Sequence, residues 1–263
     1  MLWCENDMNA SRAVVMAPGR REDGVLLLCD HASNRIPAEF GRLGLPAGEL
    51  ERHIAWDIGA AGVARALHEM TGAPLVMSNF SRLLADPNRG LDDPTLIPAI
   101  ADGAIVPGNA HLDAAARQAR INRFWRPYDE AIGRAIEEMR QAGRSPVLVS
   151  IHTFTPVWRG VPRPWHGGIL FDPGAPDMAR FPLRVLDALR RRDPDLVFGA
   201  NEPYSGGLPG DTLDRHGVRK GIEHVLVEIR QDLVEDAAGQ RAWARRVAEA
   251  LQAALDDMEA ARP

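Results

Sequence analysis

The sequence has little of what marks disulfide-bonded, secreted or membrane-spanning proteins. It contains two cysteines, Cys4 and Cys29, which are too few for a disulfide framework and suit a reducing compartment. No apolar run approaches the ~18 residues of a membrane-spanning helix. The N-terminal segment carries acidic residues and lacks the continuous apolar stretch of a signal peptide. We therefore expect a cytoplasmic protein with no membrane partner.

The chain also lacks a strong excess of charge of one sign. It has 31 basic and 36 acidic residues, a formal net charge of −5. A mildly acidic protein has no overall positive field to attract nucleic acid, so we expect no nucleic-acid partner. With 45% hydrophobic and 25% charged residues among 263, the composition is that of a folded globular protein. No linker or repeat divides it, which favours one domain over residues 23–263 after a partly ordered tail over residues 1–22.

Short apolar runs alternate with longer amphipathic segments along the whole chain. Strands are expected over residues 25–29, 74–80, 146–151, 169–171, 196–198 and 225–229. Helices are expected over residues 50–71, 111–141 with a break near Pro127, 178–192 and 238–260. This alternation predicts an α/β fold with a mostly parallel sheet, right-handed crossovers and helices on both faces. Residues 86–110, rich in Asp, Pro, Gly and Asn, predict a long irregular segment of the kind that often carries function.

Several of the expected strands end abruptly in polar residues. These strand ends are Asp30-His31, Ser81-Arg82, Ser150-Ile151-His152 and Val227-Glu228. In open α/β sheets the functional site lies beyond the carboxyl ends of the strands. Residues far apart in the sequence should therefore converge there, and His31 and His152 become neighbours if their strands are adjacent.

Some of these residues have the chemistry of a catalytic zinc site. Two imidazoles and one carboxylate are common protein ligands of such a site, with the fourth position open for water. His31 and His152 would supply the imidazoles, and Asp57, near the start of the first expected helix, is one candidate for the carboxylate. Asp30 is another, although adjacent residues of a strand point to opposite faces. Glu228 can serve as the general base that takes the proton of the water.

Each of these residues also has a structural interpretation. A histidine after a strand is often held by hydrogen bonds alone, Asp57 can cap a helix, and Glu228 can pair with Arg230. Arg82 and Arg89 can simply be solvated side chains, yet their segment has few structural reasons to be so polar, and an arginine fork suits a substrate carboxylate. From the residues alone, the sequence indicates a metal hydrolase and leaves the third ligand open.

An ordered set of motifs resembles the N-formylglutamate amidohydrolase family, in particular its shorter, predicted members. The matching motifs are Asp30-His31-Ala32-Ser33-Asn34-Arg35-Ile36-Pro37, His53 to Gly59, Ser81-Arg82 with Asp86-Pro87-Asn88-Arg89, Pro127-Tyr128, Ser150-Ile151-His152-Thr153-Phe154, Asn201-Glu202-Pro203-Tyr204-Ser205-Gly206 and His224-Val225-Leu226-Val227-Glu228-Ile229-Arg230. They span roughly residues 25–235 in the order of the family, and the ordered set is specific.

The resemblance implies a fold and a set of ligands. The family is similar to zinc carboxypeptidases and zinc-dependent cell-wall amidases, which share a three-layer phosphorylase/hydrolase-like α/β fold in one domain. By this comparison His31, Asp57 and His152 are the implied ligands of one Zn²⁺, and Glu228 is the implied general base. The sequence departs from the cell-wall amidases at Asp57, where they have Glu, and from the carboxypeptidases at Asn34, where they carry a ligand.

The resemblance further implies hydrolysis of a linear amide. The expected small-molecule substrate is an N-formyl amino acid such as N-formyl-L-glutamate, which would give formate and the amino acid. Arg82 is expected to stabilise the oxyanion together with the zinc. The expected substrate-binding residues are Ser33, Asn34, Asn88, Arg89, Asn201 and Tyr204. Two alternatives stay open: a zinc deacylase or amidase for another N-acyl amino acid or a peptidoglycan fragment, and a non-catalytic binding protein on a hydrolase scaffold. The sequence indicates no oligomeric state.

Overall fold

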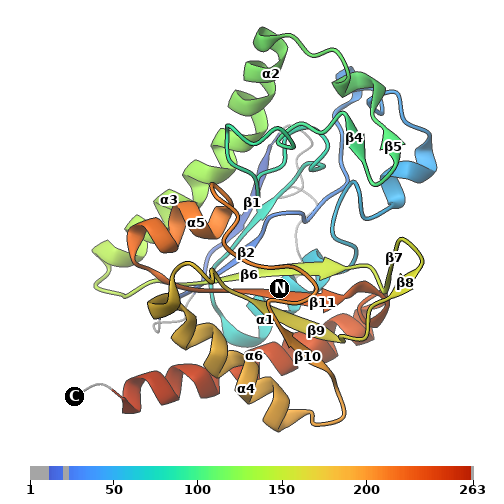
Figure 1. Cartoon of the computed structure of the whole chain (residues 1–263). Helices are drawn as coiled ribbons and strands as arrows, with labels where there is room; N and C mark the ends of the chain where they lie inside the picture. The colour runs from blue at the N-terminus through green and yellow to red at the C-terminus, as the bar shows by residue number, and fades with distance from the viewer. Residues whose placement is uncertain (1–11, 20–23, 262–263) are drawn as a thin grey trace.

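A seven-stranded sheet forms the centre of the protein in the computed structural model, which describes residues 12–19 and 24–261 (Figure 1). Side by side, its strands are β1 (Val14–Ala17), β3 (Leu75–Ser78), β2 (Val25–Cys29), β6 (Val147–Phe154), β11 (Glu223–Arg230), β9 (Gly167–Leu170) and β10 (Phe198–Ala200). Strands β3, β2, β6 and β11 are parallel to one another, and β10 is parallel to β9. β1 and β9 are antiparallel to β3 and β11. The predicted α/β fold with a mostly parallel sheet is confirmed.

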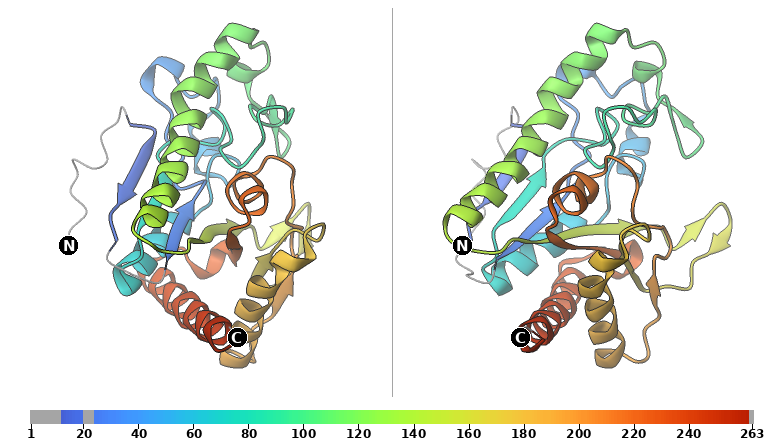
Figure 2. Two further views of the ribbon diagram at one scale, coloured as in Figure 1. Left: turned by 90° about the vertical axis from the view of Figure 1, so that its left-hand side faces the viewer. Right: turned by 60° about the vertical axis from the view of Figure 1, so that its left-hand side comes forward.

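Helices cover both faces of the sheet, so the protein has three layers (Figures 1 and 2). One face carries α1 (Ala60–Thr71), α4 (Arg180–Arg192) and α6 (Ala237–Ala260), and the other carries α2 (Ala114–Arg120), the π-helical turn η5 (Ile121–Trp125), α3 (Arg126–Gln141) and α5 (Thr212–His216). Alternate residues of a strand point to opposite faces. Leu27 and Cys29 of β2 therefore pack against α1 and α6, whereas Leu26 and Leu28 pack on the α3 side.

The central strands are the part of the fold that the sequence locates best. All residues of β2 and β6 are buried, and a strand buried on both faces shows a continuous apolar run. The edge strand β1 was not expected: its four residues are apolar, but only Val15 and Ala17 are buried, and so short an apolar run does not by itself identify a strand. Residues 1–11 and 20–22 of the expected N-terminal tail, with Cys4, lie outside the described residues.

Two helices differ from their expected bounds for local reasons. The helix expected over residues 50–71 begins at Ala60, after Gly59, whose φ is 85°. A Cβ at Gly59 would lie 2.5 Å from the carbonyl oxygen of Val234, and glycine alone adopts such a φ without strain. The helix expected over residues 111–141 contains the π turn η5 just before Pro127, whose ring nitrogen cannot donate to the carbonyl four residues earlier.

The connections contain short elements only. Two small hairpins are β4 (Ile100–Ala101) with β5 (Ala104–Ile105), and β7 (Val157–Trp158) with β8 (Val161–Pro162). The 3₁₀ turns are η2 (Ala38–Phe40), η3 (Ala47–Glu51), η4 (Pro107–Asn109), η6 (Pro176–Ala179), η7 (Val218–Lys220) and η8 (Gln231–Leu233). Within residues 12–19 and 24–261, no helix is both long and apolar enough to cross a bilayer.

Candidate active site

Three adjacent parallel strands present a row of polar side chains at their carboxyl ends. β2 pairs with β6 so that Leu28 lies opposite Ser150, and β6 pairs with β11 so that His152 lies opposite Glu228. The strands that lead to His31 and His152 are thus adjacent, as the sequence required for the two histidines to be neighbours. Leu28 packs in the core on the α3 side, and residues two positions apart share a face. Asp30, His152 and Glu228 therefore form one row on that side of the sheet.

His31, Asp57 and His152 form a compact buried cluster. Nδ1 of His31 lies 3.3 Å, and Nδ1 of His152 lies 2.8 Å, from Oδ2 of Asp57. One potential ligand atom from each residue lies within 4.8 Å of the other two. Ligand atoms at zinc distances in a tetrahedral site lie about 3.3 to 3.6 Å apart. The three atoms are therefore close enough together to hold one metal ion once their side chains adjust slightly.

The second nitrogen of each imidazole is held by a carboxylate. Nε2 of His31 lies 2.7 Å from Oδ1 of Asp86, and Nε2 of His152 lies 2.9 Å from Oδ2 of Asp30. Metal-bound histidines generally donate this second N–H to a carboxylate or carbonyl, which fixes the ring and its tautomer. With Nε2 donating, the lone pair of each Nδ1 points at the same place beside Asp57. The donor set and its outer hydrogen bonds therefore suit Zn²⁺.

Asp30 is fixed in turn by neighbouring hydroxyl groups. Its Oδ2 accepts from Ser150 Oγ at 2.9 Å, and its Oδ1 accepts from Thr212 Oγ1 at 2.8 Å. Burial raises the pKa of Asp30, but the hydrogen bond and charge of His152 outweigh it and lower the pKa to about 2. Asp30 is therefore an ionised acceptor for His152. Asp30 therefore orients the imidazole of His152. The sequence had left open that Asp30 itself binds the metal.

Two buried carboxylates, Asp30 and Asp57, contact His152. Burial lowers the pKa of His152, yet the carboxylates of Asp30 and Asp57 hold it well above the ordinary value of an imidazole. Buried carboxylates that hold a proton on a histidine in this way can exchange it for a metal cation, since metal binding releases protons from its ligands. The negative charge around His152, like the spacing of the three side chains, therefore favours a bound cation.

Glu228 lies beside His152 with an unused oxygen. Its side chain is buried, and no described residue forms a hydrogen bond with its Oε2. Burial raises the pKa of Glu228 to about 7, with a further contribution from the charge of Asp57 and an opposing one from His152. A carboxylate with a pKa near the working pH is suited to both accepting and returning a proton.

Arg82 reaches the same cluster through Asp86. Its Nη2 lies 2.6 Å from Oδ2 of Asp86, and its Nη1 lies 3.7 Å from Oδ1 of Asp57. Asp86 thus holds both His31 and Arg82. The sequence pointed to the segment that contains Asp86 but assigned no role to this residue. The missed signal is an acidic residue four positions after a candidate catalytic arginine, inside the irregular segment.

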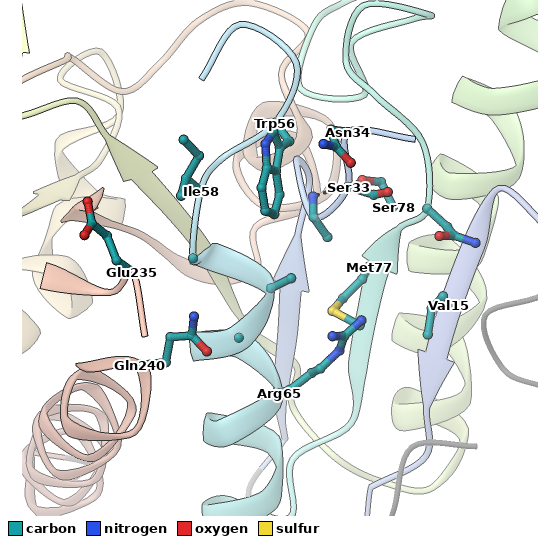
Figure 3. Close-up of a pocket in the computed structure, with 15 residues that line it drawn as sticks. Val15, Ser33, Asn34, Trp56, Ile58, Arg65, Met77, Ser78, Glu235 and Gln240 are labelled. Carbon is teal, nitrogen blue, oxygen red and sulfur yellow. Dashed lines mark hydrogen bonds between the residues drawn. The ribbon is translucent and has the colours of Figure 1, made fainter. Parts of the chain in front are cut away.

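Ser33 and Asn34, two of the expected substrate-binding residues, line a cavity of about 350 Å³ on the α1 side of the sheet (Figure 3). None of the three clustered residues is among those that line it. Asn34 Nδ2 donates to the carbonyl of Leu50 at 3.0 Å, and Ser33 Oγ accepts from the backbone N–H of Arg35 at 3.2 Å. Both side chains thus hold the loop after β2, and a role in binding substrate stays a prediction.

Three more of the expected binding residues hold other loops. Asn88 Oδ1 accepts from the N–H of Thr212 at 3.1 Å. Arg89 Nε donates to Thr95 Oγ1 at 3.2 Å, and Asn201 Oδ1 accepts from the N–H of Phe171 at 2.9 Å. Their roles in binding substrate also stay predictions.

Tyr204 differs from the others because its partner is a buried arginine, Arg163, that the sequence did not single out. Its hydroxyl accepts from Arg163 Nη1 at 3.0 Å. Burial raises the pKa of Tyr204, and so does the charge of Glu228. Tyr204 therefore lies within electrostatic range of Glu228.

Comparisons with known proteins identify the family of the chain. The family model described as N-formylglutamate amidohydrolase matches residues 23–235. A gene product of Agrobacterium tumefaciens of known crystal structure is 36% identical, with a TM-score of 0.86 over 98% of this chain and 100% of that one. An N-formylglutamate amidohydrolase from Ralstonia eutropha JMP134 has the same fold at 23% identity, with a TM-score of 0.65 over 94% of this chain and 99% of that one. No curated protein matches the sequence. The match of the family model over most of the chain shows that the protein belongs to the N-formylglutamate amidohydrolase family.

Proposed function

We propose that the protein is a zinc-dependent amidohydrolase that cleaves an N-formyl amino acid, such as N-formyl-L-glutamate, into formate and the free amino acid. Membership of the family supports amide hydrolysis, and the activity for which the family is named supports this substrate. The observation that carries the proposal is the buried cluster of His31, Asp57 and His152 with Glu228 beside it. Two imidazoles that are each oriented by a carboxylate, next to a buried acid with an unpartnered oxygen, are what a metal-dependent hydrolase requires.

In this proposal Nδ1 of His31, Nδ1 of His152 and a carboxylate oxygen of Asp57 hold the metal ion. When bound, Zn²⁺ lowers the pKa of a water molecule and polarises a carbonyl group. Asp30 and Asp86 keep the two imidazoles in the tautomer that ligates, through the contacts at 2.9 and 2.7 Å. Because both imidazoles are used as ligands, Glu228 is the residue that transfers protons.

Glu228 takes a proton from the attacking water through its unpartnered Oε2. The water oxygen bonds to the formyl carbon, and the C–N bond breaks as Glu228 returns the proton to the leaving nitrogen. The products are formate and the amine of the amino acid, so the atoms balance. Arg82, held by Asp86, presents its guanidinium toward the cluster and stabilises negative charge that develops on the formyl oxygen.

The test is an assay of purified, zinc-loaded protein against a panel of N-acyl amino acids. The panel contains N-formyl-L-glutamate, N-formyl-L-methionine, N-acetyl-L-glutamate and a muramoyl peptide, and formate or free amine is measured. We expect turnover of formyl substrates, with N-formyl-L-glutamate best, and about one zinc per chain. Turnover of only the acetyl or muramoyl compounds would show a different deacylase or amidase. No turnover together with no bound zinc would show a binding protein.

A further inference from the structure

Arg163 is a buried arginine just beyond the carboxyl end of β6. Its backbone N–H donates to the carbonyl of Pro156 at 2.8 Å, and its residue is 9% exposed. Its guanidinium lies 5.7 Å from the ring centre of Phe154. Phe154 follows His152 by two positions in the same strand, so the two side chains share a face of the sheet. Arg163 therefore lies on the side of the sheet that carries the clustered histidine and Glu228.

The contacts of this guanidinium are all with neutral groups. Nη1 donates to the carbonyl and the hydroxyl of Thr155, at 3.4 and 3.2 Å, and to the hydroxyl of Tyr204. The ring centres of Tyr204 and Trp158 lie 4.9 and 5.3 Å from its central carbon. Across the described parts of the chain, no carboxylate pairs with Arg163. Arg82 offers a contrast, since Asp86 and Asp57 lie near its guanidinium.

A buried charge without a countercharge is costly, and buried charges in proteins are usually paired. The guanidinium has five N–H donors, and the hydrogen bonds of Arg163 to the described residues use only those of Nη1. The edge formed by Nε and Nη2 therefore keeps two parallel donors, which is the geometry that receives a carboxylate through two hydrogen bonds. The rings of Trp158 and Phe154 lie close to the same guanidinium, and apolar surroundings would strengthen such a pair.

We propose that Arg163 binds a carboxylate group of the N-acyl amino acid, with Tyr204 holding the guanidinium in place. The inference rests on the proposed function and adds the residue that selects for an acidic substrate. Arg89, the arginine favoured by the sequence for this role, donates to Thr95 and lies 3.9 Å from the carboxylate of Asp93. Arg163 is the more suitable of the two because it has no countercharge among its described neighbours.

An N-formyl-L-glutamate molecule carries two carboxylates, and both have the chemistry that Arg163 recognises. Two analogues distinguish them. N-formyl-L-glutamine lacks the side-chain carboxylate, and the α-amide of N-formyl-L-glutamate lacks the α-carboxylate. The analogue whose kcat/KM changes least when Arg163 is replaced lacks the carboxylate that Arg163 binds.

The experiment measures kcat and KM of the zinc-loaded protein for these three compounds, in wild type and in Arg163→Met and Arg163→Lys. We expect Arg163→Met to lower kcat/KM for N-formyl-L-glutamate by on the order of 100-fold, mainly through KM. The variant should lose little on the amide that lacks the recognised charge. Arg163→Lys should restore part of the loss, since it keeps the charge without the fork.

The matched control is Arg159→Met in the same hairpin. Arg159 is exposed and lies 5.6 Å from the ring centre of the same Trp158, so its loss should not change the discrimination. An equal loss on all three substrates in Arg163→Met would show a merely structural role and overturn the inference. Loss of discrimination in Arg89→Met, with Arg163→Met like wild type, would place the carboxylate at Arg89 instead.

Calorimetric titration with the product L-glutamate separates this inference from the proposed function. We expect L-glutamate to bind zinc-loaded wild type and to bind Arg163→Met on the order of 100-fold more weakly. If wild type hydrolyses no formyl compound but this difference is observed, the proposed reaction is wrong and the carboxylate site stands. If wild type hydrolyses N-formyl-L-glutamate and Arg163→Met binds L-glutamate equally well, only the inference is wrong. Absence of both hydrolysis and binding would overturn both.

Discussion

Nε2 of His31 lies 2.7 Å from Oδ1 of Asp86, although 55 residues separate the two along the chain. The same carboxylate holds Arg82 through its other oxygen. Burial raises the pKa of Asp86, but the positive charges of Arg82 and His31 outweigh it and hold the pKa well below the ordinary range. One ionised side chain thus orients a proposed metal ligand and the proposed oxyanion-stabilising arginine together.

Asp86→Asn should therefore weaken metal binding without removing a ligand. Loss of a carboxylate that orients a metal-bound histidine typically costs about 10- to 100-fold in affinity or activity. Competition titration against a zinc-chelating dye measures the effect. Asp93→Asn in the same irregular segment is the control, because Asp93 contacts Thr95 and lies away from both histidines. Equal zinc affinity in wild type and Asp86→Asn would contradict the assigned role.

Glu228→Gln should retain the metal and lose turnover. The amide has nearly the shape of the carboxylate but cannot take a proton, and a positioned general base contributes about 10²- to 10⁴-fold in rate. Steady-state kinetics on N-formyl-L-glutamate and the zinc content of the purified variant check this prediction. Glu223→Gln, at the start of the same strand β11, should keep the wild-type kcat. A Glu228→Gln variant with near wild-type kcat would exclude Glu228 as the base.

Zinc should stabilise the fold through the three clustered residues. A ligand that binds only the folded state raises the free energy of unfolding, by about 2.7 kcal/mol at a concentration of 100 times Kd. We expect chelation to lower the Tm of wild type and zinc to restore it. His152→Ala should show no such response, whereas His111→Ala, at an exposed position, should respond like wild type. An identical zinc response in His152→Ala would show that the ion binds elsewhere.

Asp129 predicts a pH-dependent contribution to stability. It accepts hydrogen bonds from Arg215 Nε at 2.8 Å and from His216 Nε2 at 2.7 Å, and so ties α3 to α5. Burial raises its pKa, but the hydrogen bond of His216 and the charge of Arg215 lower it to about 2. An acid with a lowered pKa in the folded state stabilises the fold above its ordinary pKa. That stabilisation is lost as the pH falls toward 2.

Asp129→Asn should therefore lower the free energy of unfolding at pH 7 by about 1 to 3 kcal/mol. The difference from wild type should shrink between about pH 4 and pH 2, because both chains are then uncharged at this position. Urea denaturation at several pH values measures it. Glu130→Gln, which breaks only an exposed pair with Arg134, should cost under about 1 kcal/mol. A difference that grows as the pH falls would contradict the assignment.

The sequence predicts the fold well where burial leaves a continuous apolar run. β2 and β6 are buried along their whole length, and the polar residues at their ends identify His31 and His152 as candidate site residues. The direction of β9 was not predictable, because a short apolar run has the same pattern in a parallel and an antiparallel pair. The start of α1 was missed for a similar reason, since the conformation of Gly59 depends on its packing against Val234.

The outer part of the site was harder to predict than its centre. His31, Asp57 and His152 are of residue types that themselves indicate metal binding. Asp86 and Arg163 have common residue types and lie in irregular segments, where no periodicity fixes the direction of a side chain. Their roles follow only from contacts across the fold, with His31 in one case and with Tyr204 in the other.

The four-residue strand β1 has a practical consequence for work with shortened chains. Val14 to Ala17 pair with β3 and occupy the hydrogen-bonding groups along its outer edge. A chain cut after residue 19 would leave that edge bare, and a bare strand edge is a template for joining another molecule. Trimming the start of this protein should thus promote self-association, even though none of the proposed metal ligands lies in β1 or β3.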